Sequence, residues 1–437
     1  MASLSLYIVT FNCAKEPIDI PSFASQLFNG LDRPQLPDLL VVSLQELAPL
    51  CHSLIGGSFL RPYFSRIQEA VGNAAKELTG EAPDRYTPFA IHNVGMTAIM
   101  AFARDSAVID GVEMAGVGLG RWNIGSKGAA GLRFLYQETE LTFVAAHLAA
   151  MEGKLQRRNE DWKNIVRGLV FLSSVQEQRG NAAAISEAPR EEERRLLSGS
   201  PQYTGIYKPT SHLFLAGDLN YRTSTLKPSP TDYRDSFPQP NDDEDSPRHF
   251  SKLFRHDQLT QEREAGRTCH GLVEAPVTFP PTYKYTSDGP FLVSDEDIPE
   301  WNWARHRWPG WCDRVLYLDI PAWLKGPAPK AQIIPRKYVA LTLLPTSDHR
   351  AVTLALTVPL VPIPNPDADE DSEDPRIQPP FDINPDWKSE RQKARVLELM
   401  IGFGLYFTHT WGGRAVILCI AVGIASGYWM MRGALDF

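Results

Sequence analysis

The chain has 437 residues, of which 43% are hydrophobic and 22% are charged, and this composition is typical of a globular protein with a sizeable core. Its net charge is −8, from 44 basic and 52 acidic residues, which argues against a general nucleic-acid-binding protein. The 5 cysteines form no C-x-x-C pair, so a disulfide framework and a zinc site are both disfavoured.

A series of apolar, β-rich runs within residues 1–360 predicts buried strands. The first run begins close to Met1 without a basic segment before it, so it favours a strand over a signal peptide. Several runs end in a polar side chain, which places candidate chemistry at strand ends. In chain order the runs are SLYIVTF, DLLVVSLQE, TAIMAFA, AAGLRFLY, LTFVAAHL, HLFLAGDLN, WCDRVLYLDI and AVTLALTV.

Between these strands we expect one long helix and two long surface segments. Apolar residues recur at helical spacing from Leu155 to Leu172, which predicts a helix over 152–177. The charged stretch 180–205 is expected to be a mobile insertion, and the Pro-, Ser- and Asp-rich stretch 223–248 a surface loop. Residues 361–390 are acidic and proline-rich, so we expect a disordered, extended linker there.

The charge-free run 415–431 predicts a membrane-spanning helix. Its length of about 26 Å at 1.5 Å per residue suits a thin bilayer such as that of the endoplasmic reticulum. A buried core helix is the alternative, but the run lies beyond the expected linker. We expect the basic, aromatic segment 391–414 to lie at the membrane interface, with a two-pass hairpin over 399–431 as the competing interpretation. Basic residues precede the span, so the positive-inside rule predicts a cytosolic body. Only about six residues follow the span, so we expect it to insert after synthesis as a tail anchor.

Asn12, Glu46 and the stretch RWNIGSKG are the first candidate site residues. A carboxylate such as Glu46 at a strand end is a hard ligand suited to Mg²⁺, and Asn12 could support such a ligand. A turn-capping asparagine and a surface glutamate are the simpler explanations when each is taken alone. In RWNIGSKG the glycines permit close backbone approach, and Lys127 offers a point charge for phosphate. A hairpin turn is the alternative, and the Walker A spacing is absent.

The remaining candidates are two histidines and several acidic groups. Asp218 and Asn220 are two apart on a predicted strand and point to one face, so one could take a proton from water while the other holds a phosphate oxygen. His147, taken alone, is more often a core residue. These side chains together suit metal-assisted water attack on a phosphate ester. No G-x-S-x-G elbow is present, which disfavours a covalent enzyme. Further candidates are Asp313 in WCDR, Asp348 and His349 in SDHR, and Lys284 in PPTYKY.

The motifs TFN, LQE, NIGSKG, HL, GDLNYR, PPTYKY, PGWCDRVL and SDHRAV resemble those of the inositol polyphosphate 5-phosphatases of the endonuclease/exonuclease/phosphatase superfamily. The resemblance spans nearly all of residues 1–360. It implies an α/β (α+β), DNase I-like fold for this catalytic domain, in which two mixed β-sheets form a four-layer sandwich with outer helices. To this fold the sequence adds a C-terminal transmembrane helix.

The resemblance also implies Mg²⁺-dependent hydrolysis of an inositol 5-phosphate, with a role for each motif residue. Glu46 would bind Mg²⁺, with Asn12 and Asp348 nearby. Asp218 would activate water, Asn220 and His147 would hold the scissile phosphoryl group, and Asp313 would orient His349 toward it. The expected contacts to the neighbouring 4-phosphate come from Tyr283, Lys284 and Arg314, with help from Lys127. Asn123 is a further expected substrate-binding residue.

Two departures and several alternatives accompany the resemblance. Ser126 stands where the family usually has Asn, which affects the substrate contact of that loop, and Ala351 stands where it usually has Pro. The membrane helix favours a lipid substrate, phosphatidylinositol 4,5-bisphosphate, and we expect its hydrolysis at the endoplasmic reticulum. We also expect a monomeric catalytic domain that binds no nucleic acid. The alternatives are a soluble inositol polyphosphate 5-phosphatase, a neutral sphingomyelinase-like phosphodiesterase, an apurinic-type endonuclease and a catalytically silent membrane-tethered protein.

Overall fold

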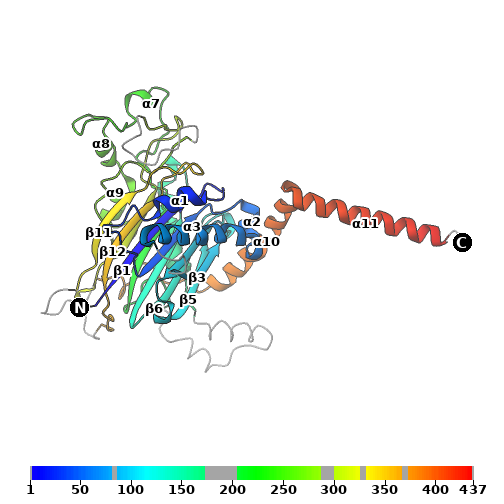
Figure 1. Ribbon diagram of the computed structural model, residues 1–437, viewed down its shortest axis with the longest axis horizontal. Coiled ribbons are helices and arrows are strands. Elements are labelled where there is room, and N and C mark those ends of the chain that lie inside the picture. The colour runs from blue at the N-terminus through cyan, green and yellow to red at the C-terminus, as the bar shows by residue number, and fades with distance from the viewer. Residues whose placement is uncertain are drawn as a thin grey trace.

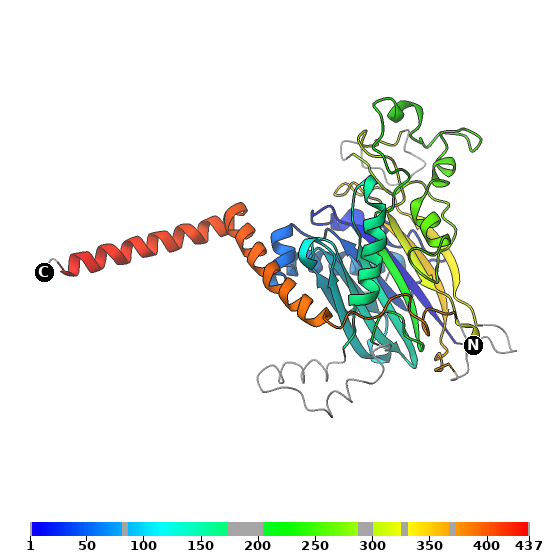
Figure 2. The same cartoon turned by 180° about the vertical axis from the view of Figure 1, so that it is seen from behind.

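Two mixed β-sheets pack face to face, and helices cover their outer faces (Figures 1 and 2). This arrangement appears in a computed structural model, which describes residues 2–80, 86–172, 204–286, 300–324, 331–366 and 373–435. The predicted four-layer α/β sandwich is therefore confirmed.

The first sheet has six strands in the order β11-β12-β1-β2-β4-β3. The pair β1–β2 is parallel, and the other neighbours are antiparallel. The parallel pairing brings the carboxyl ends of β1 and β2 to the same edge of the sheet. The strands are β1 (Ser3–Asn12), β2 (Leu39–Gln45), β3 (Thr87–Val94), β4 (Thr97–Ala103), β11 (Ile334–Ala340) and β12 (Val352–Pro359).

The second sheet also has six strands, in the order β5-β6-β7-β8-β10-β9. Here β7 and β8 are parallel, whereas β10 runs antiparallel to β8. The end of β7, the end of β8 and the start of β10 therefore meet at one edge. The strands are β5 (Ile109–Gly118), β6 (Gly128–Tyr136), β7 (Thr139–His147), β8 (Ser211–Asp218), β9 (Leu272–Val273) and β10 (Asp313–Leu318).

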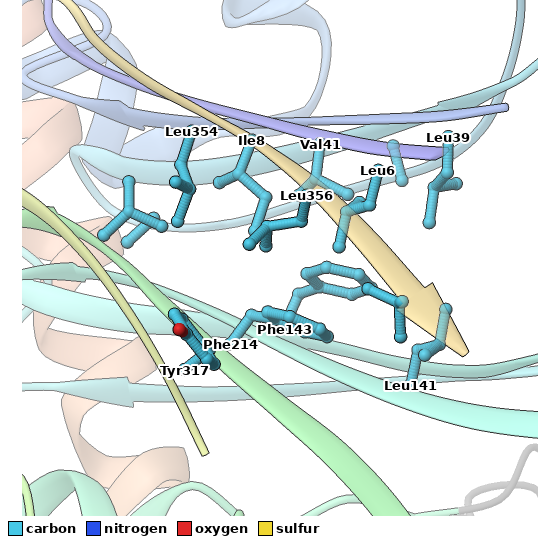
Figure 3. Close-up of a cluster of buried hydrophobic side chains, with 14 of the residues drawn as sticks. Leu6, Ile8, Leu39, Val41, Leu141, Phe143, Phe214, Tyr317, Leu354 and Leu356 are labelled. Atoms are coloured by element: carbon cyan, nitrogen blue, oxygen red, sulfur yellow. The ribbon is translucent and has the colours of Figure 1, made fainter. Parts of the chain in front are cut away.

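The main hydrophobic core fills the space between the two sheets (Figure 3). Because side chains alternate along a strand, Leu6 and Ile8 of β1 point into this core while the residues between them face outward. On the opposite sheet Phe143 stacks between Phe134 and Phe214, with ring centroids 5.6 and 5.0 Å apart. This packed interior gives the strand-end side chains a rigid base.

Helices bury the outer face of each sheet. α1 (Ile20–Leu27) and α3 (Arg61–Thr79) pack on the first sheet, and α4 (Leu155–Gly168) packs on the second. The helix predicted over 152–177 is thus shorter than expected, because after Gly168 the apolar residues Leu169–Phe171 are buried beside the sheet. The smaller helices are α2 (Leu50–Ile55), α7 (Asp232–Asp235), α8 (Phe250–Phe254) and α9 (Gln258–Glu264).

The long segments predicted at the surface have different outcomes. Most of the predicted insertion 180–205 lies outside the described residues. The segment 223–248 forms α7 and surrounding turns, and its Phe237 is buried in a small cluster with Tyr285, Trp301 and Trp303. This part of the predicted loop is therefore anchored to the body by aromatic packing.

The structure differs from the expected linker over residues 373–386. There the chain lies against the body, and the buried Arg376 guanidinium donates hydrogen bonds to the backbone oxygens of Leu318 and Ser211 at 3.4 Å each. An ion pair of 2.9 Å with Asp374 balances its charge. The acidic composition predicted disorder, but this one arginine supplies the body with a hydrogen-bonding partner that the composition does not reveal.

Two helices complete the chain. α10 (Trp387–His409) packs against α2, and after Thr410 the chain continues into α11 (Trp411–Leu435), which projects away from the body (Figures 1 and 2). Among the described helices, Trp411–Arg432 of α11 is long and apolar enough to cross a membrane, and nearly all of its side chains are exposed. This candidate span contains the predicted run 415–431.

Candidate active site

Four polar side chains meet where the strands of the two sheets end. Asn12 closes β1, His147 closes β7, Asp218 closes β8 and Asp313 opens β10. His147 and Asp313 are the register partners of Asp218 on its two sides. All four residues are buried, so the sheet register places ionisable groups side by side in a setting of low dielectric constant.

Asp218 is the centre of this group. One carboxylate oxygen, Oδ2, accepts a hydrogen bond of 2.9 Å from Asn12 Nδ2 and lies 3.2 Å from His147 Nε2. The other, Oδ1, accepts from the backbone N–H of Asn220 at 3.1 Å. Burial opposes ionisation of Asp218, but the hydrogen bond to His147 and the charges of His349 and Lys127 hold its pKa well below its ordinary value. Asp218 is therefore ionised at neutral pH.

His349 and Asp313 form a second buried pair. His349 Nδ1 lies 2.9 Å from Asp313 Oδ2, which also accepts a hydrogen bond of 2.7 Å from the Thr282 hydroxyl. Burial opposes protonation of His349, but the carboxylates of Asp313, Asp218 and Asp348 raise its pKa to about 9. The imidazole is thus a cation at neutral pH, and its contact with Asp313 fixes its orientation.

Glu46 directly follows β2 in a left-handed conformation, with φ of 46°. Its carboxylate lies 2.9 Å from Lys15 Nζ and 3.6 Å from Lys127 Nζ, and the Lys127 ammonium also contacts the His147 ring. Burial opposes ionisation of Glu46, but His147, Lys127 and Lys15 hold its pKa below its ordinary value. The burial of His147 and the charge of Lys127 lower the pKa of His147.

Tyr283, Lys284 and Asp348 lie together on the other side of His349. The Tyr283 ring packs on the His349 ring at 4.5 Å between centroids, and the Lys284 ammonium contacts the Asp348 carboxylate. Asp348 Oδ1 lies 3.9 Å from His349 Nε2. The predicted substrate contacts Tyr283 and Lys284 are therefore next to the predicted catalytic histidine.

Asn220 is held in place at the site by its neighbours. It has a left-handed backbone with φ of 57°, its Nδ2 donates to Leu148 O at 3.2 Å, and its Oδ1 accepts from Arg222. The Arg222 guanidinium also lies over the Tyr283 ring, 4.5 Å from its centroid. The side-chain nitrogen of Asn220 carries a second hydrogen that can meet a phosphate oxygen.

The predicted substrate-binding role of Arg314 is wrong. It follows Asp313 on β10 and therefore points to the opposite face of the sheet. There its guanidinium is fully buried in ion pairs with Asp257 at 2.9 Å and with Glu274 at 2.5 Å. The alternation of side chains along the strand makes Arg314 a structural residue, out of reach of a substrate at Asp313.

Asn123 differs from its predicted role, whereas Asn12 supports a carboxylate of the site. Asn123 is exposed and donates to Glu390 of α10 at 3.2 Å, so its amide is turned toward the C-terminal helix. The side-chain oxygen of Asn12 accepts from Ala14 N at 3.0 Å, and its nitrogen faces Asp218. Asn12 in this arrangement supports the Asp218 carboxylate through its side-chain nitrogen.

The acidic side chains present fit a hard divalent cation. Carboxylate oxygens are the ligands that Mg²⁺ prefers, and the ionised Glu46 is paired with the ammonium groups of Lys15 and Lys127. The ligand atoms of Asp218, Asp313 and His349 also lie within 4.8 Å of one another, but the cationic His349 imidazole has no lone pair to offer a metal. One oxygen of the buried Asp313 has no hydrogen-bond partner among the described residues.

Several residues that support the site were not assigned from the sequence. Lys15 pairs with Glu46, Thr282 donates to Asp313, and Arg222 orients Asn220. Ser347 donates to Asn12 O at 2.6 Å and accepts from His349 N at 3.0 Å. Three of these residues stand inside the motifs already quoted: Thr282 in PPTYKY, Arg222 in GDLNYR and Ser347 in SDHR. Their position within a motif was the sequence signal that could have identified them as site residues.

Comparisons with known sequences agree with this geometry. The profile of endonuclease/exonuclease/phosphatase family 2 matches residues 9–355. The chain is 32% identical over 252 residues to type II inositol polyphosphate 5-phosphatase 14 of Arabidopsis thaliana, a match covering 55% of this chain and 20% of that protein. It is 27% identical over 322 residues to polyphosphatidylinositol phosphatase INP53 of Saccharomyces cerevisiae, covering 73% and 23%. The chain thus spans about a fifth of the length of these relatives.

A comparison with solved structures supports the fold. The inositol polyphosphate 5-phosphatase domain of Sp synaptojanin, solved with inositol (1,4)-bisphosphate and calcium, matches with a TM-score of 0.57 and 23% identity. This match covers 92% of the present chain and 90% of the synaptojanin chain. The family profile spans most of the body and the sequence relatives share one activity class. The chain therefore belongs to the endonuclease/exonuclease/phosphatase family, within which it is similar to inositol polyphosphate 5-phosphatases.

Proposed function

We propose that this protein is a Mg²⁺-dependent phosphoinositide 5-phosphatase that converts phosphatidylinositol 4,5-bisphosphate to phosphatidylinositol 4-phosphate. The observation that carries the proposal is the buried group of Asp218, His147, Asp313 and His349 at adjoining strand ends. It combines an ionised carboxylate with a fixed cationic imidazole, which is what water attack on a phosphate ester requires.

In the proposed reaction Asp218 accepts the proton of the attacking water. Its low pKa in the free protein arises from the nearby positive charges of His349 and Lys127 together with the hydrogen bond to His147. A bound phosphate dianion would neutralise much of that positive charge, so the basicity of Asp218 would rise when substrate is present. The carboxylate would then become a better proton acceptor at the moment when water is positioned.

The positive groups would hold the phosphoryl oxygens. His349, cationic and oriented by Asp313, would contact the scissile phosphate, with Asn220 and His147 beside it. A divalent cation held by Glu46, with Asp348 as a further carboxylate, would polarise a phosphate oxygen and offset developing negative charge. Lys284, Tyr283 and Lys127 would bind the neighbouring 4-phosphate.

Helix α11 supports a lipid as the substrate. We propose that Trp411–Arg432 spans a membrane, because tethering raises the effective concentration of a body relative to headgroups in the same membrane. The name of the relative INP53, a polyphosphatidylinositol phosphatase, also favours a lipid. We further propose the endoplasmic reticulum membrane with the body in the cytosol, since basic residues precede the span. Protease protection in sealed microsomes, with localisation by microscopy, would test both points.

Substrate choice can be tested on the full chain purified in mild detergent. Phosphate release would be measured with Mg²⁺ on phosphatidylinositol 4,5-bisphosphate and the 3,4,5-trisphosphate in mixed micelles, and on soluble inositol 1,4,5-trisphosphate. The proposal predicts the highest kcat/KM on the 4,5-bisphosphate lipid. A preference for the soluble headgroup would keep the reaction and reject the lipid assignment, whereas inactivity on all three would reject the proposed function.

A further inference from the structure

We infer that helix α10 is an integral part of the catalytic body. Its buried residue Glu398 is a positioning residue for Lys127, the lysine proposed to bind phosphate. The inference rests on the proposed function, because it gives Lys127 a role toward phosphate. It gives a role in positioning the glycine-rich loop to the segment 391–414, which the sequence predicted to lie at a membrane surface.

Glu398 is a buried carboxylate that reaches across to the glycine-rich loop. Its side chain is fully buried, and its Oε1 accepts a hydrogen bond of 2.9 Å from the backbone N–H of the buried Gly125. Two residues later in that loop stands Lys127. A buried carboxylate would be costly without cationic partners, and α10 supplies them as Arg391 at 2.8 Å and Arg395 at 3.3 Å.

Arg395, one of the two partners of Glu398, also fixes α10 to helix α2. The Arg395 guanidinium donates to Leu54 O at 2.6 Å and to Ile55 O at 2.8 Å, which are carbonyls at the carboxyl end of α2. Helix carbonyls there have no partner within the helix, and they favour a cation. Gly402 lets the helices approach closely, since a Cβ there would lie 2.9 Å from Ile55 Cγ1.

Gly125 is held between Glu398 and a tight turn of the first sheet. Its carbonyl accepts from Met96 N at 2.9 Å, and a Cβ on Gly95, whose φ is +52°, would lie 2.1 Å from that same oxygen. Met96 O in turn accepts from Leu47 N at 3.3 Å, and Leu47 is the residue after Glu46. The Glu398 carboxylate therefore closes a series of contacts that reaches both Lys127 and Glu46.

This series ends at the catalytic group. Lys127 Nζ lies 3.6 Å from Glu46 Oε1 and contacts the ring of His147. Small errors in the position of a charged group can cost about 100-fold in rate. Loss of the Gly125 contact would free the loop, so Lys127 would spend less time beside the phosphate. The same helix leads through Thr410 into α11, so the proposed membrane helix is joined directly to the part that holds this loop.

The test uses the full chain with soluble inositol 1,4,5-trisphosphate, which separates the loop from any effect of membrane docking. Glu398→Ala should lower kcat/KM roughly 10- to 100-fold. Glu398→Gln, which keeps an acceptor for Gly125 N–H, should recover most of that loss. The exposed α10 residue Gln392 provides the matched control, and Gln392→Ala should retain wild-type kcat/KM.

A double variant distinguishes positioning from simple structural damage. If Glu398 acts through Lys127, then Glu398→Ala should cost nothing further in a Lys127→Ala background. Additive losses in the double variant would overturn the inference, as would full activity of Glu398→Ala. If Glu398→Ala does not fold, Gly402→Val offers a second route, since it separates α10 from α2 without changing Glu398; wild-type activity of that variant would also overturn it.

Hydrogen–deuterium exchange gives a readout that is independent of activity. The Gly125 amide should exchange at least ten times faster in Glu398→Ala than in the wild type, and near the wild-type rate in Glu398→Gln. If the wild type hydrolyses no phosphoinositide but shows this exchange pattern, the proposed function fails while the contact stands. Unchanged exchange at Gly125 would overturn the inference even in an active enzyme.

Discussion

Asp218 and Asp313 are register partners on the antiparallel strands β8 and β10, and the pKa values of their carboxyl groups are shifted in opposite directions. Burial opposes ionisation of both. The hydrogen bond to His147 and the surrounding positive charges nevertheless hold the pKa of Asp218 well below its ordinary value, whereas burial raises the pKa of Asp313. Two adjacent carboxyl groups in different environments can perform different tasks. Here Asp218 faces the proposed water, and Asp313 orients His349.

The first prediction concerns Asp218. Asp218→Asn keeps the size of the side chain and an oxygen that can accept hydrogen bonds, but it removes the proton acceptor. We expect kcat of the folded variant on the bisphosphate lipid to fall by about 10²- to 10⁴-fold. Glu264→Gln, at an exposed position of α9, should leave kcat unchanged. An Asp218→Asn enzyme within tenfold of wild type would contradict the proposed role.

The second prediction is a pH dependence of stability carried by His349. Its pKa is raised from 6.5 to about 9 in the folded protein, so the protonated imidazole stabilises the fold. This contribution is fully present below pH 6.5 and is lost as pH rises through about 9. In EDTA, the difference in unfolding free energy between wild type and His349→Gln should shrink by on the order of 3 kcal/mol from pH 6 to pH 10. Chemical denaturation at several pH values measures it, and a constant difference would show that His349 is not charged in the fold.

The third prediction concerns Lys284, which lies beside His349 through its contact with Asp348. Removing its charge should weaken substrate binding, because charge-assisted contacts to phosphate are strong. We expect Lys284→Ala to raise KM by about tenfold for substrates that carry a 4-phosphate, with a smaller change in kcat. Lys76→Ala, on the exposed side of α3, serves as the matched control. An unchanged KM would place the 4-phosphate elsewhere.

The fourth prediction separates Arg314 from the substrate-binding residues. Arg314→Ala leaves Asp257 and Glu274 buried without their cation, which should cost about 3–5 kcal/mol of stability. Arg104→Ala, which breaks the half-exposed pair with Asp38, should cost at most about 1 kcal/mol. The fraction of Arg314→Ala that remains folded should have the wild-type KM. A raised KM with unchanged stability would restore the substrate role predicted from the sequence.

The strands that could be predicted from the sequence are the central ones. All eight predicted runs form strands, and the four strands without a predicted run are β3, β5, β9 and β11, which lie at the edges of the two sheets. Central strands are buried on both faces and therefore carry continuous apolar residues. β5 and β11 have mostly half-exposed residues, so their sequences mix polar and apolar side chains and resemble loops.

The candidate site was predictable where short motifs stand at strand ends. His147, Asp218 and Asp313 meet because adjacent strands of one sheet bring them to one edge. Arg314 was assigned wrongly because the motif WCDR does not state which face of the strand each residue occupies. The role of Glu398 could not be predicted, since its partner Gly125 lies far away in the sequence and the contact exists only after α10 docks.

The C-terminal region shows a similar limit. Composition indicated a disordered linker and an interfacial helix, but Arg376 and Arg395 each donate hydrogen bonds to backbone carbonyls of the body and so help to attach both stretches to it. Such contacts are satisfied by backbone carbonyls, which carry no signal in the sequence. The apolar run 415–431 was predictable because hydropathy is a property of the segment itself.

The most direct test of the central claim is to identify which phosphate leaves. The full chain in detergent would be incubated with phosphatidylinositol 4,5-bisphosphate over a Mg²⁺ titration in EDTA-treated buffer, and the lipid product would be separated by headgroup chromatography. The account predicts phosphatidylinositol 4-phosphate as the product, formed only with added Mg²⁺ and lost in Asp218→Ala. Formation of the 5-phosphate isomer, release that does not depend on Mg²⁺, or equal turnover by Asp218→Ala would contradict it.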